Sequence, residues 1–259
     1  MNLLFMDRVF FTIFGYEIYW YSVFIASALI INLAILFFIC KKKNLSKNLP
    51  FELVVSLVPL AIIFARIFYI LFDNNVTFLE FFAFRDGGLS ILGAIIGGTI
   101  GLSIYCLIKK VNFLEIADVL APLLVLGQAI GRWGNYFNQE VYGQLVTNPA
   151  WQWFPFAVFV NGEWFQALFF YESILNLIGF ALLIFLLFKL KNKKGYVLSA
   201  YLMFYGLVRF LMENLRQEEY ILTVAGLPVS KIIAGLMFVI GLTILIILLI
   251  KQKRQKVLK

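Results

Sequence analysis

The side chains most able to do chemistry in this sequence are arginines that lie within or at the ends of strongly apolar segments. Arg132 lies near the end of one such segment, and Arg209 lies in another. An arginine near the centre of a bilayer costs about 2.5 to 3.5 kcal/mol to insert, so it usually has a partner or a task. Its planar, permanently charged guanidinium group matches phosphate oxygens in a way that lysine does not. Two arginines that face the same space point to an anionic ligand.

The spacing of polar residues around these arginines predicts two polar helix faces. If a helix continues past residue 132, spacings of four, three and four residues place a first stripe on one face. In the other segment, spacings of four, four and three give a second stripe, in which Arg209 and Glu213 are placed to pair. Such stripes cannot face lipid, and the alternative to a functional role is that they satisfy one another inside a helix bundle. The first stripe holds Gln128, Arg132, Asn135 and Gln139, and the second holds Tyr205, Arg209, Glu213 and Arg216.

The apolar segments that carry these residues identify the chain as a membrane protein. Of its 259 residues, 63% are hydrophobic and 14% are charged, which is too apolar for a soluble domain of this length. Seven segments approach the roughly 20 residues that cross about 30 Å of hydrocarbon. We therefore predict an all-α protein of seven transmembrane helices that forms a single integral membrane domain over residues 1–259. The segments run approximately over residues 19–40, 51–72, 88–108, 114–137, 167–188, 196–212 and 232–250.

The lysines and arginines predict how the chain is oriented. Most of the 22 basic residues follow the first, third, fifth and seventh segments, and short basic connections stay in the cytoplasm. The N-terminus is therefore expected outside and the C-terminus inside. The net charge of +8 then reflects topology and does not indicate nucleic acid binding. The longest external connection, residues 138–166, is rich in tryptophan and phenylalanine and is expected to lie in the headgroup layer.

The absence of histidine from the sequence excludes several kinds of chemistry. Histidine triads, HExxH metal sites and histidine proton shuttles all need this residue type. The two cysteines, Cys40 and Cys106, fall at the expected cytoplasmic ends of segments, where thiols stay reduced. No metal and no dissociable cofactor are suggested.

The run G-R-W-G-N-Y-F-N-Q-E-V-Y-G, from Gly131 to Gly143, resembles the signature of bacterial prolipoprotein diacylglyceryl transferases. It differs from the family pattern at Tyr136, where phenylalanine is usual. Residues 205–216 also resemble the family's penultimate span, and D-G-G-L-S at residues 86–90 resembles its glycine-rich entry to the third span. Seven spans with an external N-terminus agree with the family's architecture, so the resemblance extends over nearly the whole chain.

Two segments depart from the family pattern. After G-G-L-S the family commonly has an aromatic residue and a histidine, whereas this chain has Ile91 and Leu92. The family also tends to carry histidine and proline shortly before a tyrosine and glutamate pair, whereas residues 166–172 read Q-A-L-F-F-Y-E. Either histidine is dispensable for the chemistry, or the chain is a divergent member with altered activity.

The resemblance implies a reaction and its location. It implies transfer of the diacylglyceryl group of phosphatidylglycerol to the lipobox cysteine of prolipoprotein signal peptides, with formation of a thioether and release of glycerol phosphate. The nucleophile would belong to the substrate, and the phosphate leaving group would need its charge neutralised. The same resemblance implies a multi-pass protein of the bacterial cytoplasmic membrane whose site is reached from the outer face.

The resemblance also implies the residues of the site. Arg132 and Arg209 are expected to neutralise the phosphate. Asn135 and Asn138 are expected to hydrogen-bond the glycerol, and Glu140 and Glu213 to orient the arginines. Gly93, Gly97 and Gly101 form a small-residue face that favours helix packing. Catalytic roles are thus predicted for Tyr21, Arg132, Glu140, Arg209 and Glu213, and substrate binding for Gly93, Arg132, Asn135, Asn138, Tyr205 and Arg216.

Two other classes of function fit the same charges. A transporter would also place charged residues at mid-membrane, but the sequence shows no paired repeat halves of the kind many transporters have. A catalytically silent lipid-binding scaffold would keep the arginines, and the missing histidine favours that alternative. Only the enzyme would consume phosphatidylglycerol, and only when a cysteine peptide is present.

Overall fold

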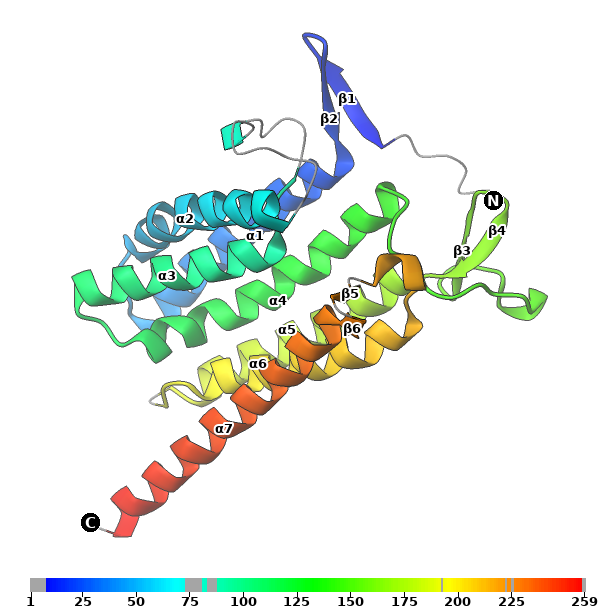
Figure 1. The fold of residues 1–259 in the computed structure, drawn as a ribbon. Coiled ribbons are helices and arrows are strands. Elements are labelled where there is room, and N and C mark those ends of the chain that lie inside the picture. The colour runs from blue at the N-terminus through cyan, green and yellow to red at the C-terminus, as the bar shows by residue number, and fades with distance from the viewer. Residues whose placement is uncertain are drawn as a thin grey trace. The chain divides into compact units, whose positions relative to one another are not determined.

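The computed structural model of the chain describes residues 8–72, 81–82, 88–191, 193–221, 223–224 and 226–257. Seven helices in the described residues are long and apolar enough to cross a membrane, which confirms the predicted number of spans. Asp86 and Gly87, in the segment that resembles the entry to the third span, lie outside the described residues. The helices in Figure 1 are α1 (Trp20–Lys43), α2 (Leu49–Phe72), α3 (Ile91–Lys109), α4 (Phe113–Phe137), α5 (Leu168–Lys189), α6 (Tyr196–Met212) and α7 (Val229–Val257).

The helices group into two compact units. One unit comprises Met1–Ile35 and Ala117–Lys259, and the other comprises Leu36–Ile116. The single membrane domain and the orientation of the two termini stay predictions.

In the unit Leu36–Ile116, α2 and α3 pack closely through glycines of α3. A Cβ atom added to Gly93 would lie 2.2 Å from the carbonyl oxygen of Phe64, and one added to Gly97 would lie 2.2 Å from that of Leu60. Gly101 makes the next contact of this kind, one turn further along α3. The predicted small-residue face is therefore a helix-packing surface, because only glycine allows the two backbones to approach this closely.

Arg66 of α2 is a buried structural residue in the same unit. Its Nε donates to the carbonyl oxygen of Phe81 at 3.2 Å, and its Nη1 donates to that of Gly88 at 2.9 Å. Gly88 precedes α3, which begins at Ile91 because the hydroxyl of Ser90 accepts a hydrogen bond from the backbone N–H of Gly93. Arg66 thus holds the segment that leads into α3.

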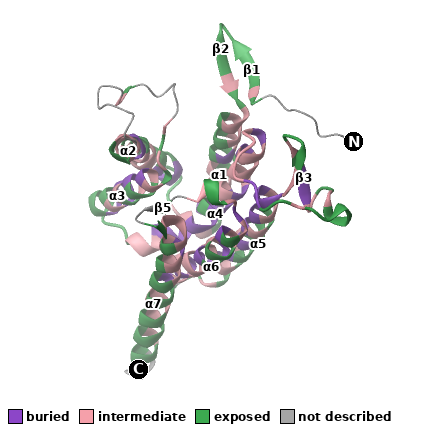
Figure 2. Ribbon diagram, turned by 45° about the vertical axis from the view of Figure 1, so that its right-hand side comes forward, coloured by how far each residue is buried: buried purple, intermediate pink, exposed green. Residues whose placement is uncertain are grey.

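In the other unit, α4 is the most buried of the spanning helices. In the most apolar 18-residue stretch of each helix, 56% of the residues are buried in α4 and 11% in α7. Figure 2 shows α7 as exposed or intermediate over most of its length. Asp118 of α4 is buried and accepts hydrogen bonds from the backbone N–H groups of Gly195 at 2.6 Å and Leu198 at 2.7 Å. These N–H groups lie at the start of α6, where a helix leaves its first donors without partners. Asp118 therefore caps α6 from a neighbouring helix.

Besides the predicted helices, the described residues form three short antiparallel hairpins, one before α1 and two in connections between helices. Two of them turn through two residues with positive φ, Phe14–Gly15 and Asn161–Gly162, a conformation that matches the twist of paired strands. The hairpins pair β1 (Val9–Ile13) with β2 (Tyr16–Tyr19), β3 (Ala157–Val160) with β4 (Glu163–Gln166), and β5 (Thr223–Val224) with β6 (Leu227–Pro228).

Candidate functional site

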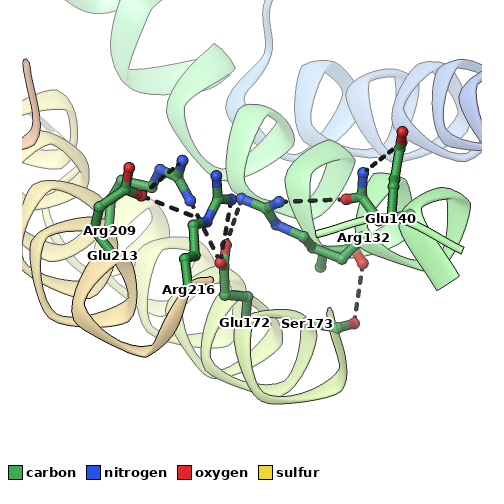
Figure 3. Close-up of polar contacts among 9 residues, drawn as sticks. Arg132, Glu140, Glu172, Ser173, Arg209, Glu213 and Arg216 are labelled. Atoms are coloured by element: carbon green, nitrogen blue, oxygen red, sulfur yellow. Dashed lines mark hydrogen bonds and ion pairs between the residues drawn. The ribbon is translucent and has the colours of Figure 1, made fainter. Parts of the chain in front are cut away.

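Five charged side chains from α4, α5 and the end of α6 meet in one buried group, with Glu172 at its centre (Figure 3). The carboxylate of Glu172 pairs through Oε2 with Nη2 of Arg132. Its other oxygen, Oε1, accepts a hydrogen bond from Nη1 of Arg209 at 3.4 Å and lies 3.7 Å from Nη2 of Arg216. We call Arg132, Glu172, Arg209, Glu213 and Arg216 the arginine cluster.

Glu213 joins the two arginines of the second predicted stripe. Its Oε2 lies 3.1 Å from Nη2 of Arg209, which confirms the pair predicted from a spacing of four residues. The same oxygen lies 3.4 Å from Nε of Arg216. After α6 ends at Met212, residues Glu213–Leu215 form a 3₁₀ turn, and this tighter turn brings residues three apart to the same side. The local helix geometry therefore directs both arginines to Glu213.

The arginine cluster is nearly inaccessible and carries an excess of positive charge. The side chains of Glu172 and Glu213 are 1% and 2% exposed, and those of the three arginines are 8 to 16% exposed. Three guanidinium groups face two carboxylates, which leaves one positive charge in excess. Burial and the neighbouring Arg209 lower the pKa of Arg216 to about 10, so that side chain stays charged at neutral pH. Such a group attracts an anion.

The signature residues after Arg132 form a chain of hydrogen bonds that begins at this arginine. Arg132 Nη1 donates to Asn135 Oδ1 at 3.3 Å, and Asn135 Nδ2 donates to Glu140 Oε1 at 3.0 Å (Figure 3). Asn138 Nδ2 also donates to Glu140 Oε1, at 3.3 Å. The hydrogen bonds described for Glu140 thus link it to Arg132 through Asn135. Glu213, in contrast, pairs directly with Arg209 and Arg216.

The first predicted stripe was wrong at its last residue. Helix α4 ends at Phe137, and Gln139 has a positive φ of 53°, so Gln139 does not continue the helical face. Val141 also has a positive φ, 59°, which is unusual for a β-branched residue. Between them the backbone N–H of Glu140 donates to the carbonyl oxygen of Asn135 at 3.0 Å. The chain therefore folds back on the end of α4, which is how Glu140 comes to lie beside Asn135.

Tyr21 of α1 packs on α4 within the signature, whereas Tyr205 of α6 stacks on a tyrosine of its own helix. A Cβ atom at Gly134 would lie 2.4 Å from Cδ2 of Tyr21, so the tyrosine ring packs directly on the backbone of α4 between Arg132 and Asn135. The ring of Tyr205 stacks on that of Tyr201 with centroids 5.9 Å apart. Tyr21 therefore lies beside the signature residues. The catalytic role of Tyr21 and the substrate-binding role of Tyr205 stay predictions.

The last residue of the signature, Gly143, ties the signature to the end of α6. Its backbone pairs with that of Arg216 in an antiparallel bridge, and its N–H donates to the carbonyl oxygen of Gln166 at 3.1 Å. A Cβ atom there would lie 2.6 Å from Cβ of Gln166, so a larger residue would displace this contact. Gly143 thus helps to fix the backbone that carries Arg216.

For two residues the structure differs from what the sequence predicted about the site. Glu172 was not predicted, although it is an acidic residue inside a span, a position that usually signals a function. Gly93 belongs to the unit Leu36–Ile116, where its contacts with α2 account for it as a packing residue, and its predicted role in substrate binding stays a prediction. Among the described residues, no three histidine, cysteine, aspartate or glutamate side chains are grouped so that they could hold a metal ion.

Comparison with known proteins identifies the family. The model of the prolipoprotein diacylglyceryl transferase family matches residues 8–247. Phosphatidylglycerol–prolipoprotein diacylglyceryl transferase 1 of Clostridium perfringens is 37% identical over 258 residues, covering 97% of this chain and 98% of that protein. The transferase of Finegoldia magna is 36% identical, covering 96% and 97%. That of Oceanobacillus iheyensis is 35% identical, covering 91% and 88%. The chain is thus a multi-pass membrane protein and belongs to the prolipoprotein diacylglyceryl transferase family.

Proposed function

We propose that this chain transfers the diacylglyceryl group of phosphatidylglycerol to the lipobox cysteine of prolipoproteins. In this reaction the cysteine sulfur attacks the glyceryl carbon that carries the phosphate. A carbon–sulfur bond forms, the carbon–oxygen bond to the phosphate breaks, and the thiol loses its proton. The products are a thioether-linked diacylglyceryl cysteine and glycerol phosphate.

The observation that carries this proposal is the charge of the arginine cluster. Its three guanidinium groups exceed its two carboxylates by one positive charge, and the phosphodiester of phosphatidylglycerol carries one negative charge. A bound headgroup would therefore make the group neutral. Neutrality matters because an uncompensated charge costs several kcal/mol where water is excluded, on the order of the cost of breaking a buried ion pair.

The arginines also suit the transition state. As the carbon–oxygen bond breaks, negative charge grows on the departing phosphate, and preorganised positive groups stabilise it more than they stabilise the intact lipid. We assign this role to Arg132 and Arg209. Glu172 and Glu213 hold the guanidinium groups in place, so that little reorganisation is needed during the reaction.

The hydrogen-bonded chain beyond Arg132 fits the rest of the headgroup. In the proposed complex, Asn135 and Asn138 bind the terminal glycerol, and Glu140 fixes the orientation of both amides. The predicted roles of Tyr21, Tyr205, Arg216 and Gly93 are part of the same proposal.

The thiol in this proposal is activated without histidine, because the sequence contains none. A free cysteine thiol has a pKa of about 8.5, and nearby guanidinium groups lower it. The excess positive charge of the arginine cluster therefore favours the thiolate of a bound precursor.

We also propose that the protein lies in the bacterial cytoplasmic membrane with its site open to the outer face. The support is the distribution of basic residues, which favours an external N-terminus and a cytoplasmic C-terminus. In this orientation residues 138–166, with exposed Trp151, Trp153 and Phe159, lie in the external headgroup layer.

The decisive experiment incubates purified protein with phosphatidylglycerol and a lipobox peptide and detects the product by mass spectrometry. We expect a diacylglyceryl adduct on the cysteine peptide and none on a peptide with serine in its place. Arg254→Ala, which removes an exposed arginine of α7, is the matched control for Arg132→Ala and should keep full activity. Lipid binding without an adduct would favour the scaffold, and transport of a solute without lipid consumption would favour the transporter.

A further inference from the structure

A second polar layer lies one helix turn further along each of the three helices that build the arginine cluster. Asn176 follows Glu172 by four residues on α5, and residues four apart lie on the same face of a helix. Arg132 and Arg209 both contact Glu172, so the faces of α4 and α6 that carry them turn toward α5. The corresponding positions on those faces are Gln128, four residues before Arg132, and Tyr205, four residues before Arg209.

On all three helices, the move of four residues away from the arginine cluster leads in the same direction. The arginine cluster lies near the last residues of α4 and α6 and near the first residues of α5. Each step of four residues moves about 6 Å along the helix, away from the end nearest the cluster and further into the span. Asn176, Gln128 and Tyr205 are therefore expected at one level, between the cluster and the middle of the helices.

Asn176 is the unusual member of this layer. The residue is 0% exposed, and neither Nδ2 nor Oδ1 has a hydrogen-bond partner within the described parts of the chain. Gln128 is similar in part, because its Nε2 donates to the hydroxyl of Tyr201 at 3.0 Å while its Oε1 has no partner there. By contrast, the buried hydroxyl of Ser173, one turn away, donates to the carbonyl oxygen of Ala129 at 3.0 Å.

A buried amide without a partner is costly, and the great majority of buried polar groups in proteins avoid this state. Packing alone does not explain the residue, because leucine has the same number of non-hydrogen side-chain atoms as asparagine and no polar atoms to satisfy. The position therefore calls for a ligand with hydrogen-bonding atoms at this level.

We infer that Asn176 is a specificity residue that donates a hydrogen bond to an ester carbonyl oxygen of the diacylglyceryl group. This inference rests on the proposed function. In a glycerophospholipid whose phosphate lies at the arginine cluster, the two ester carbonyls come a few bonds beyond the phosphate, on the side that leads into the hydrocarbon. These oxygens only accept hydrogen bonds, and the amide nitrogen of Asn176 is a donor without a partner. The hydroxyl of Tyr205 lies on the same face as Arg209 and offers a second donor.

The test compares ester-linked phosphatidylglycerol with its dialkyl ether analogue, which has the same headgroup and chains but no carbonyl groups. Both lipids are given to wild-type protein and to Asn176→Leu, and KM and kcat are measured from the adduct on a lipobox peptide. For the wild type we expect a KM about 10-fold higher with the ether lipid, because the loss of one hydrogen bond typically weakens affinity by about this factor. For Asn176→Leu we expect the KM for the ester lipid to rise to that for the ether lipid, which itself stays unchanged.

Thermal unfolding separates this role from a structural one. Because Asn176→Leu removes an unpartnered buried amide, we expect its Tm without lipid to equal or exceed that of the wild type. The matched control is Asn48→Leu, at an exposed position between α1 and α2, which should leave both KM values unchanged.

The possible results distinguish the proposed function from the inference about Asn176. If wild-type protein forms no adduct with either lipid, the proposed function fails and the inference falls with it. If it forms adducts with equal KM for both lipids, the function stands and the carbonyl contact is refuted. A fall in kcat of Asn176→Leu that is equal for the two lipids, with unchanged KM, also refutes it. Equal KM values of the wild type for the two lipids refute the inference even if the variant does not fold.

Discussion

The change from Glu172 to glutamine tests the central electrostatic claim, because it removes one charge from the arginine cluster and keeps the shape of the side chain. Glu172 is 1% exposed and faces Arg132, Arg209 and Arg216, at 3.4 and 3.7 Å for the last two. Removing its charge raises the excess in the arginine cluster from one positive charge to two. Three guanidinium groups would then share the carboxylate of Glu213 alone.

The size of the effect follows from these distances. At an effective dielectric constant of about 20, two unit charges 3.4 Å apart attract each other by about 5 kcal/mol, and the cost of burying both charges offsets much of this. Removing one partner of a buried ion pair typically destabilises a protein by about 3 to 5 kcal/mol. For a chain of this length we therefore expect Tm to fall by about 10 °C.

The assay is thermal unfolding of purified Glu172→Gln in detergent, with and without added lipid. Phosphatidylglycerol should raise the Tm of the variant more than that of the wild type, because its phosphate replaces the lost negative charge. A zwitterionic lipid should not do so. Glu163→Gln, at the exposed first residue of β4, is the control and should leave Tm unchanged. An unchanged Tm for Glu172→Gln, or equal recovery with both lipids, would refute the view that Glu172 neutralises the arginines.

Three further predictions concern single contacts. Arg132→Ala should lower turnover by about 100-fold or more, since one charge-stabilising donor is lost, while the protein stays folded; adduct formation and Tm measure the two effects. Asp118→Ala should cost about 2 kcal/mol of folding free energy, because two N–H groups at the start of α6 lose their acceptor, and Asp118→Asn should cost less because it keeps one acceptor oxygen. Gly97→Ala should destabilise by about 1 to 3 kcal/mol, since its Cβ would lie 2.2 Å from the carbonyl oxygen of Leu60. Gly98→Ala, whose Cβ would meet nothing within 4 Å, should be neutral or stabilising by up to about 1 kcal/mol; equal Tm values for the two glycine variants would contradict the packing argument.

Features that depend on neighbours in sequence could be predicted. The seven helices follow from the length of the apolar segments, and the sixth was predicted with the bounds that the structure shows, Tyr196–Met212. The pair Arg209 and Glu213 follows from a spacing of four residues on one helix. The packing role of Gly97 and its neighbours follows in the same way from a repeat of small residues.

Features that depend on contacts between distant segments were missed. Glu172 contacts arginines of α4 and of the end of α6, and no periodicity in α5 indicates which charges it meets. Gln139 was placed on a helical stripe because periodicity does not show where α4 ends, and the end is set by the backbone conformation around Glu140. The hairpin β3–β4 had a local signal that was overlooked: Asn161–Gly162 is a typical two-residue hairpin turn.

The composition of the arginine cluster argues for binding over simple structural stability. If its charges only satisfied one another, two arginines and two glutamates would cost least, since every buried charge would have an opposite partner. Arg216 adds a third guanidinium that shares Glu172 and Glu213 with the others and leaves a positive charge uncompensated. A monoanionic phosphodiester removes that imbalance on binding. A zwitterionic headgroup brings its own cation and does not, so we propose that the same excess charge that destabilises the empty cluster favours an anionic lipid such as phosphatidylglycerol over a zwitterionic one.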